Sequence, residues 1–427
     1  MALTIDLAAQ AKKASIAMAA LSSDVKNNAL AVIAKALQNN AASIIDANKI
    51  DLEAAENAHL ASPLLKRLKF DEAKVKEVVE GVESLIKLAD PVGETLAATE
   101  LDKGLELYKV SCPIGVIGVI FESRPDALVQ ISSLCLKSGN SAILKGGSEA
   151  VNTNRILAQI INEASVKAGI PKGWIQLIES RAEVNEMLKL DKYIDLIIPR
   201  GSNEFVKYIM DNSNIAVLGH ADGICHVYVD KDADIDMAVR VATDSKTQYV
   251  AVCNAAETLL VHESVAKEFL PKLKEVLDSL HVELRGCEKT QRIISVIPAT
   301  DEDWATEYLD YIYSIKIVSS FDEAIEHINT FSSGHTESII TTDKDAARKF
   351  MSLCDSGNVF WNASTRFSDG FRYGLGAEVG ISTNKIHARG PVGLEGLMIY
   401  KWKLFGNGDI VADYSSGKKK FTHKKIQ

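Results

Sequence analysis

One cysteine, Cys253, marks the place in this chain where covalent chemistry is most plausible. It lies in residues 249–262, YVAVCNAAETLLVH, just before an apolar run typical of a buried strand. A thiol acts as a nucleophile through its thiolate, which needs exposure near positive charge or a helix end. The turn residues before Glu257 allow that exposure, whereas full burial would make Cys253 a small packing residue. Taken alone, the packing interpretation is favoured, so other residues must decide.

Two glycine-containing turns are candidates for holding phosphate. Residues 145–149 (KGGSE) end one apolar run, and residues 199–203 (PRGSN) end another. Glycine lets the backbone approach a ligand, and the amides and dipole at the start of the next helix attract anions. Such turns end strands in all α/β proteins, and the dinucleotide fingerprint GxGxxG is absent, so each turn alone is a weak signal.

A glycine-rich segment near the C-terminal end is a further candidate. Six glycines punctuate residues 371–397. Long loops in compact domains are usually functional, and the alternative is a structural crossover. Three arginines on or beside the segment, Arg366, Arg372 and Arg389, supply donors for carboxylate or phosphate.

The composition is that of an ordinary globular protein. The chain has 427 residues, 47% of them hydrophobic and 25% charged, which is enough for two or three domains. Its net charge of -9 argues against nucleic acid or an anionic membrane as a general partner. The six cysteines lack CxxC spacing, so we expect no disulfide frame and no metal site. The sequence shows neither a basic leader nor an apolar span of about 18 residues, so we expect a cytoplasmic protein.

The elements that position these residues follow a repeated order of strand, turn and helix. The first hundred residues have helical periodicity, and residues 105–110 alternate like an arm strand. Short apolar runs then alternate with helical patterns in two series, the first at 114–121, 141–145, 174–178 and 194–198, and the second at 225–229, 258–261, 315–318, 338–341 and 358–361. The pattern predicts an α/β fold with two doubly wound, Rossmann-like domains, each a parallel sheet with helices on both faces.

In this order and spacing, the motifs resemble the aldehyde dehydrogenase superfamily. The likeness rests on residues 113–116 (PIGV), on Lys145 with Ser148, on Gly201 with Ser202, and on Cys253. Within the superfamily, the glutamate-5-semialdehyde dehydrogenase family is similar in several further motifs: 121–126 (FESRPD), 223–230 (GICHVYVD), 333–337 (SGHTE), 362–367 (NASTRF) and the span 374–397. The match continues to residues 410–414 and so covers most of the chain.

The resemblance implies an activity. It is the NADPH-dependent reduction of L-glutamyl 5-phosphate to L-glutamate 5-semialdehyde and phosphate, the second step of proline biosynthesis from glutamate. Cys253 would attack the acyl phosphate, phosphate would leave, and hydride would reduce the thioester. Because an acyl phosphate is already activated, the site mainly needs a thiolate, oxyanion donors and positive charge. The water-activating glutamate of the superfamily's ELGG motif is missing from residues 217–220 (VLGH).

The same likeness assigns roles to individual residues. Lys145, Ser148, Gly201 and Ser202 would bind the cofactor, NADPH or NADP⁺, and Glu337 would hold the nicotinamide ribose. Polar residues on loops would bind the substrate: Arg124, Asn362, Ser382, Thr383 and Arg389. Arg124 would hold the leaving phosphate or the substrate carboxylate, and Ser382 and Thr383 are favoured for the α-amino and α-carboxylate groups. His220 is a packed residue or, less plausibly, a base.

The likeness also implies a domain organisation. Residues 1–100 and 113–222 would form the NADP-binding domain, 223–386 the catalytic domain, and 101–112 with 393–427 a β arm and tail for homo-oligomerisation. An association with glutamate 5-kinase would shelter the unstable acyl phosphate. The alternatives are another acylating aldehyde dehydrogenase on the same fold, which would use coenzyme A, and a non-catalytic nucleotide-binding relative.

Overall fold

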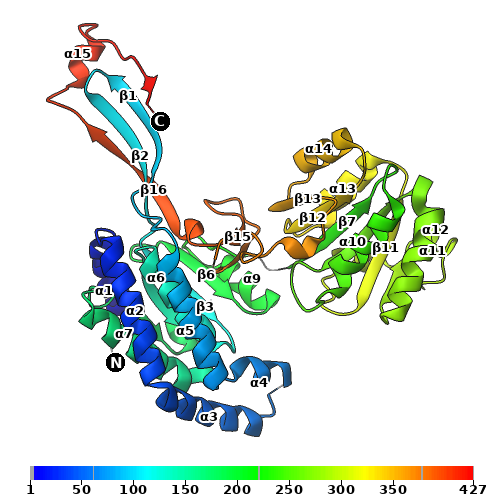
Figure 1. The fold of residues 1–427 in the computed structure, drawn as a ribbon, viewed down its shortest axis with the longest axis horizontal. Coiled ribbons are helices and arrows are strands. Elements are labelled where there is room, and N and C mark those ends of the chain that lie inside the picture. Colours follow the sequence, from blue (N-terminus) through cyan, green and yellow to red (C-terminus); the bar gives the residue numbers. More distant parts are fainter. Residues whose placement is uncertain (1–3, 61, 220–221, 377, 427) are drawn as a thin grey trace. The chain divides into compact units, whose positions relative to one another are not determined.

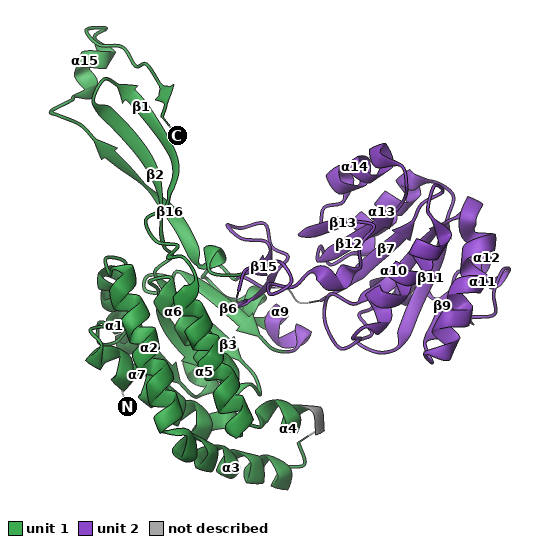
Figure 2. Ribbon diagram, viewed as in Figure 1, with its two compact units in different colours: residues 1–201, 208–217, 393–427 green, residues 202–207, 218–392 purple. Residues whose placement is uncertain are grey.

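The computed structural model describes residues 4–60, 62–219, 222–376 and 378–426, which divide into two compact units (Figures 1 and 2). The first unit comprises residues 1–201, 208–217 and 393–427, and the second comprises residues 202–207 and 218–392. None of the described helices is long and apolar enough to cross a membrane.

The first unit is built on a four-stranded parallel sheet with the order β5-β4-β3-β6. Its strands are β3 (Val116–Phe121), β4 (Ser141–Lys145), β5 (Ile175–Ile178) and β6 (Leu196–Arg200). Every residue of β3 is buried, as expected for the central strand of a sheet covered on both faces. The carboxyl ends of β4 and β6 lead into the two glycine turns, so the sheet presents both turns at one edge.

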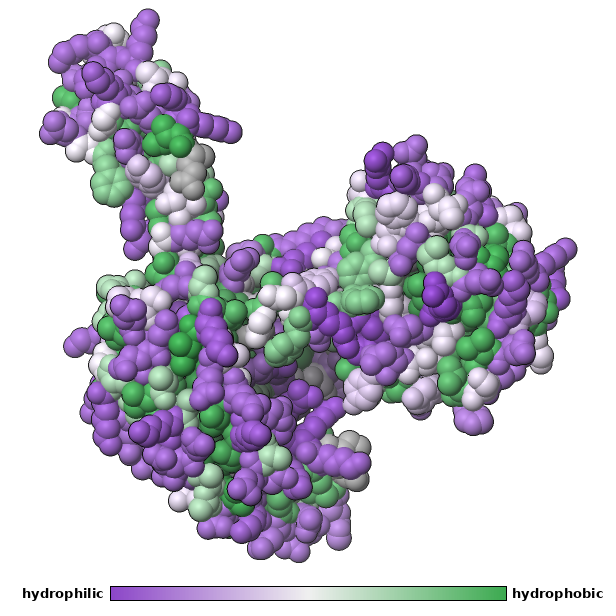
Figure 3. Space-filling view, viewed as in Figure 1, coloured by the Kyte–Doolittle hydropathy of each residue, from purple (hydrophilic) through white to green (hydrophobic). Residues whose placement is uncertain are grey.

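Helices cover this sheet (Figure 1). They are α1 (Thr4–Met18), α2 (Ser23–Asn39), α3 (Ala41–Asn57), α4 (Ser62–Leu68), α5 (Glu72–Lys87), α6 (Pro125–Lys137), η1 (Ser148–Ala150), α7 (Val151–Lys167), α8 (Arg181–Met187) and α9 (Asn203–Asn212), the last of which spans the boundary between the units. In Figure 3 the visible face of the helical part of the first unit is largely hydrophilic, with narrow apolar strips, as amphipathic helices packed on a core should be.

A second, antiparallel sheet forms the arm of the first unit, in the order β16-β2-β1-β17. Its strands are β1 (Thr95–Asp102), β2 (Leu105–Pro113), β16 (Met398–Phe405) and β17 (Lys424–Lys425), and a short helix, α15 (Val411–Ser415), precedes β17. The strand predicted at 105–110 is confirmed within β2, whereas β1 was not predicted.

The second unit contains a seven-stranded parallel sheet with the order β10-β9-β11-β8-β7-β12-β13. Its strands are β7 (Cys225–Val229), β8 (Ala256–His262), β9 (Glu283–Gly286), β10 (Ile297–Pro298), β11 (Ile312–Val318), β12 (Thr336–Ile340) and β13 (Asn358–Trp361). Buried apolar residues of β7, β8 and β11, such as Val227, Leu259 and Ile315, pack against helices that follow the strands.

The remaining elements of the second unit are helices and one small hairpin. They are α10 (Ile235–Thr247), α11 (Glu263–Ser279), α12 (Glu288–Gln291), η2 (Asp301–Ala305), α13 (Phe321–Phe331), α14 (Lys344–Leu353), η3 (Thr365–Phe367) and the two-stranded sheet of β14 (Gly380–Ser382) and β15 (Gly390–Val392). A last short helix, η4 (Glu395–Leu397), belongs to the first unit. The predicted fold class, two α/β sheets wound with helices and accompanied by a β arm, is confirmed.

Candidate active site

Cys253 lies in the turn between α10 and β8, where residues of the same unit contact its backbone. The Cys225 thiol at the start of β7 donates to the Cys253 carbonyl oxygen at 3.2 Å. Gly223 lies against the Cys253 backbone, where a Cβ atom would overlap the carbonyl oxygen and Cα. Cys253 itself is partly exposed, whereas Cys225 is fully buried. The turn therefore fixes the Cys253 backbone, and the residue is partly exposed although its thiol is largely buried.

The charges around Cys253 set its protonation state. Burial raises the pKa of the Cys253 thiol to about 12, and the carboxylates of Glu307 and Glu378 add to the rise. The Arg366 guanidinium lowers that pKa and so opposes them. In the free protein the thiol is therefore protonated at neutral pH, and the cation beside it bears directly on its reactivity.

Glu307, which the sequence analysis did not single out, belongs to this site. Asn203 at the start of α9 donates to Glu307 Oε2 at 2.5 Å. Burial raises the pKa of Glu307, against the effect of hydrogen bonds from Asn203 and the Gly223 backbone. The 3-10 helix of residues 301–305 itself contains three acids and Glu307 follows it, so nothing in the local pattern distinguishes the acid that acts on Cys253.

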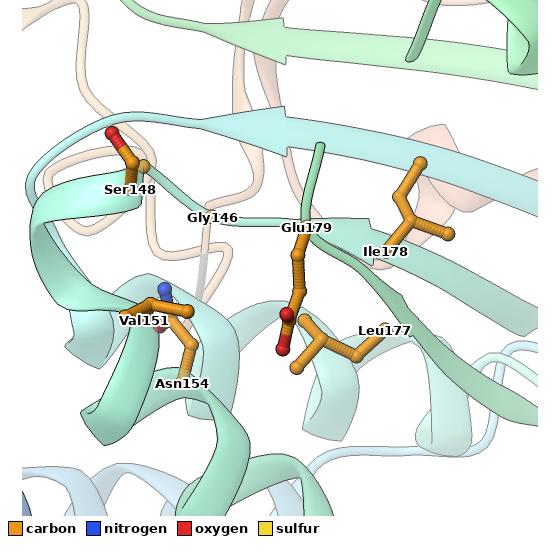
Figure 4. Close-up of a pocket in the computed structure, with 8 residues that line it drawn as sticks. Gly146, Ser148, Val151, Asn154, Leu177, Ile178 and Glu179 are labelled. Atoms are coloured by element: carbon orange, nitrogen blue, oxygen red, sulfur yellow. The ribbon is translucent and has the colours of Figure 1, made fainter. Parts of the chain in front are cut away.

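The first glycine turn of the first unit borders a cavity of about 150 Å³. Figure 4 shows Asn154 from α7 and Glu179 from the end of β5 facing the space between them. A Cβ atom at Gly146 would overlap the Asn154 side chain, so the glycine keeps the turn close to α7. Asn154 Oδ1 is buried without a hydrogen-bond partner among the described residues. A buried acceptor without a partner beside a glycine turn is suited to a polar ligand.

Two predicted cofactor residues flank this cavity. Ser148 is exposed and opens η1, which continues into α7, whose Asn152 and Thr153 amides donate to the Asp51 carboxylate at 3.1 and 2.8 Å. Lys145 ends β4 and is half-buried; burial lowers the pKa of its ammonium group, and the carboxylates of Glu149 and Glu122 oppose that shift. Both positions are consistent with a bound anion at the turn.

Glu149 also fixes the neighbouring turn, which carries Arg124. Ser123 donates to Glu149 Oε1 from its backbone amide at 2.5 Å and from its hydroxyl at 2.7 Å. Ser123 has a positive φ of 45°, which is uncommon outside glycine, so the two hydrogen bonds stabilise a strained backbone. Arg124 follows as the exposed N-cap residue of α6.

The second glycine turn follows β6. Gly201 and Ser202 are both exposed, and the Ser202 hydroxyl accepts a hydrogen bond from the Phe205 amide at 3.4 Å. The boundary between the two units falls between Gly201 and Ser202. This turn is therefore both a helix start and a connection between units.

Comparisons with known proteins give the family. The model of the aldehyde dehydrogenase family matches residues 4–313 and 293–377. A γ-glutamyl phosphate reductase from Acetivibrio thermocellus is 68% identical over 421 residues, which cover 99% of this chain and 98% of the relative. One from Methanosarcina barkeri is 54% identical, covering 98% and 96% of the two chains. The chain belongs to the γ-glutamyl phosphate reductases of the aldehyde dehydrogenase family.

Solved structures agree with this membership. The crystal structure of a γ-glutamyl phosphate reductase from Thermotoga maritima superposes with a TM-score of 0.94 at 43% identity, covering 96% of this chain and 100% of that one. An acetylating aldehyde dehydrogenase from Geobacillus thermoglucosidasius shares the fold, with a TM-score of 0.63 at 19% identity and coverage of 95% and 97%. The protein is an oxidoreductase, and its family implies a nicotinamide cofactor. The glycine turn and Asn154 cavity of the first unit fit such a group.

In this reductase family member, the environment of Glu337 opposes its predicted contact with the nicotinamide ribose. Glu337 is fully buried in β12. One oxygen accepts from the His226 amide at 2.8 Å and lies 3.1 Å from the His226 ring; the other accepts from Ser356 at 3.0 Å and from Ser332. Both oxygens are thus engaged inside the sheet. A contact with the nicotinamide ribose would have to displace these hydrogen bonds, which therefore oppose the prediction for Glu337.

Asn362 also makes contacts within its own unit. Its side-chain oxygen accepts from the Thr341 amide at 3.0 Å, and its nitrogen donates to the Thr341 carbonyl at 3.0 Å. Asn362 has a positive φ of 56°, which asparagine tolerates better than most residues. The side chain thereby closes the turn after β13, and a substrate contact would compete with these bonds.

The other substrate candidates lie in the hairpin region of the second unit. Ser382 is fully buried in β14, and its hydroxyl has no partner among the described residues. The Thr383 amide donates to Gly219 at 3.4 Å, and its carbonyl accepts from Arg389 Nε at 3.2 Å. Arg389 also donates to the Asp355 carbonyl at 2.9 Å and pairs with the Asp355 carboxylate at 3.3 Å.

The structure brings Ser382, Thr383 and Arg389 together, but Arg389 mainly fastens the loop of residues 383–389. Ser382 has the one buried hydroxyl of this group that is open to a new partner among the described residues. Of the stretch where the family's hydrolytic glutamate is missing, residues 217–219 are described, whereas His220 lies outside the described residues.

Proposed function

We propose that this protein reduces L-glutamyl 5-phosphate with NADPH to L-glutamate 5-semialdehyde and phosphate, the second step of proline biosynthesis. The observation that carries the proposal is the fixed, partly exposed Cys253 turn in a chain 68% identical to a γ-glutamyl phosphate reductase over its length. Lys145, Ser148, Gly201 and Ser202 would hold the cofactor. Arg124, Ser382, Thr383 and Arg389 would hold the substrate, with Asn362 a weaker candidate.

In the proposed reaction, Cys253 performs the covalent work. Its sulfur attacks the acyl carbon, the bond from that carbon to the phosphate oxygen breaks, and phosphate departs with the bonding electrons and takes up the thiol proton, leaving a thioester. When bound by Lys145, Ser148, Gly201 and Ser202, the nicotinamide cofactor would supply the hydride for the thioester carbonyl. The carbon–sulfur bond then breaks, releasing the aldehyde and the Cys253 thiolate. The Cys253 backbone amide is one donor for the oxyanion.

The lack of the family's water-activating glutamate disfavours hydrolysis of the Cys253 thioester. Residues 217–219, Val-Leu-Gly, contain no carboxylate that could activate water. A thioester that lacks the base at this position is less readily hydrolysed, which favours hydride transfer or attack by phosphate in the reverse direction.

The reverse reaction tests the proposal. Semialdehyde, NADP⁺ and phosphate are mixed with the protein, and NADPH absorbance is followed with phosphate omitted or replaced by coenzyme A. Phosphate-dependent turnover is expected, together with its loss in Cys253→Ser and its retention in Cys112→Ser, which removes a partly exposed thiol of the arm. Turnover with coenzyme A and none with phosphate would favour the acylating alternative. Parallel assays with NAD⁺ test the preference for NADP⁺.

The arm is the proposed surface for homo-oligomerisation. β16 pairs with β2 along one edge, and among the described strands it has no partner on the other. Large apolar side chains of β16 are exposed: Ile399, Tyr400, Trp402, Leu404 and Phe405. A second copy could add a strand at this edge. Analytical ultracentrifugation of the full chain and of Trp402→Lys tests this assembly, and pull-down with glutamate 5-kinase tests the proposed association with that enzyme in the cytoplasm.

A further inference from the structure

Arg366 is a buried cation whose donors are mostly unused. It lies in η3, and the residue is 7% exposed. Its Nε donates to Gln248 Oε1 at 3.0 Å, and among the described residues the guanidinium makes no other hydrogen bond and no ion pair. A guanidinium has five N–H donors in a rigid fork, so several remain available for a ligand.

The segment that carries Arg366 is fastened to the Cys253 turn on both sides. Gln248, which binds the guanidinium, caps the end of α10 ahead of Cys253. On the other side, Asn254 Nδ2 donates to the Ser368 carbonyl at 2.7 Å. All of these residues belong to the second unit. The effect of the Arg366 charge on the Cys253 pKa agrees with this proximity.

A buried charge without an ion partner is costly unless an anion meets it. The neighbouring Thr365 is fully buried, and its hydroxyl also has no partner among the described residues. A planar guanidinium beside a free hydroxyl suits phosphate, which accepts several hydrogen bonds at once. In the proposed reaction, phosphate is the group that leaves the acyl carbon attacked by Cys253, so it is the anion expected at this place.

We propose that Arg366 binds the phosphoryl group of the acyl phosphate beside Cys253 and holds the phosphate as it leaves. The inference rests on the proposed function and deepens it, because it names a phosphate-binding cation within the unit that holds Cys253. In the forward step the carbon–oxygen bond to phosphate breaks while Arg366 retains the departing dianion. In the reverse step the same site positions phosphate to attack the Cys253 thioester.

The two stages of the reverse reaction separate this role from others. With semialdehyde and NADP⁺ alone, hydride transfer forms the thioester and about one NADPH per site. Phosphate then releases the acyl group and permits turnover. Arg366→Met is expected to slow the first stage, because the Arg366 charge lowers the pKa of Cys253, and in addition to raise the KM for phosphate by about 10- to 100-fold, the usual effect of losing a charge-assisted hydrogen bond. Arg366→Lys should be intermediate, and Arg292→Met, an exposed arginine 75% accessible, should match the unaltered protein.

A measurement on the unaltered protein remains decisive if Arg366→Met does not fold. Inorganic phosphate at its KM should slow alkylation of Cys253 by iodoacetamide, read at that residue by mass spectrometry, and Arg366→Lys should weaken the protection. An unchanged phosphate KM, or no protection by phosphate, would overturn the assignment. Absence of phosphate-dependent turnover in the unaltered protein would instead reject the proposed function.

Discussion

Replacing Lys246 by methionine should make the second unit sensitive to alkaline pH. Lys246 at the end of α10 lies 2.5 Å from Glu257 in β8, and both side chains are fully buried. The Leu309 amide donates to the other Glu257 oxygen at 3.3 Å. Burial raises the pKa of Glu257 to about 7 even though Lys246 lowers it. Without Lys246 the pKa of Glu257 must rise further.

The sign and size of the effect follow from proton linkage. A carboxyl with a raised folded-state pKa keeps its proton in the folded state while the unfolded state loses it above a pKa of about 4.3. Stability therefore falls with rising pH until the folded-state pKa is reached, which in the unaltered protein is about 7. In Lys246→Met the fall continues. At about 1.36 kcal/mol per pH unit, the variant should lose about 2 kcal/mol more than the unaltered protein between pH 7 and about pH 8.5.

Native-state hydrogen exchange of peptides from α10 and β8 measures this difference as the free energy of opening, after correction for the intrinsic pH dependence of exchange. Lys349→Met is the matched control, because Lys349 forms an exposed pair with Asp322 at 2.8 Å and should change little. Lys246→Met/Glu257→Gln should abolish the extra fall. Parallel pH curves for Lys246→Met and the unaltered protein, or an equal fall in the double variant, would refute the reasoning.

Three further perturbations have definite expected outcomes. Gly223→Ala should lower phosphate-dependent turnover by about 100-fold, because the added Cβ would displace the Cys253 backbone. Gly81→Ala is the control, since an added Cβ there would have nothing within 4 Å. Equal turnover rates of the two variants would contradict this prediction. In the free protein, iodoacetamide at neutral pH should modify Cys287 before Cys253. Burial raises the pKa of Cys287, but hydrogen bonds from Thr290 and nearby backbone amides lower it by more, whereas the pKa of Cys253 is raised. Peptide mapping over time decides the order of modification. Glu149→Ala should destabilise the turn at Ser123 by about 1–3 kcal/mol, measured as faster exchange of residues 122–124, and unchanged exchange there would argue against the strained turn.

The sheets could be predicted from sequence where strands are buried on both faces. The predicted strand at 141–145 coincides with β4, and the one at 225–229 coincides with β7, because continuous apolar runs bounded by turns have few other interpretations. β9 was missed because it has only four residues, in which half-buried, charged Glu283 and Arg285 alternate with buried Leu284 and Gly286. β1 was missed because most of its residues are only half-buried. Edge and arm strands depend on pairing partners distant in sequence.

The site was only partly predictable for a related reason. The local sequence proposes Cys253 as a nucleophile, but its exposure is decided by Gly223 and Cys225, which contact its backbone from a different strand region. The same holds for Arg366, which in sequence is one of three arginines near a glycine-rich segment. Its burial and its free donors follow from η3 packing beside α10.

The two glutamates show most clearly what local pattern leaves undetermined. Glu337 follows Gly334 near the start of β12, and β12 is flanked by β7 and β13, with the Glu337 side chain fully buried. A buried carboxylate is tolerated only where donors surround it, and His226, Ser332 and Ser356 from three different segments supply them. Glu307 stands in an acidic, irregular stretch with no such signature, and its importance arises from Asn203, about a hundred positions away, which orients it near the nucleophile. Which of two acids serves the site is therefore fixed by strand order and by long-range hydrogen bonds, neither of which is encoded within the ten residues around either glutamate.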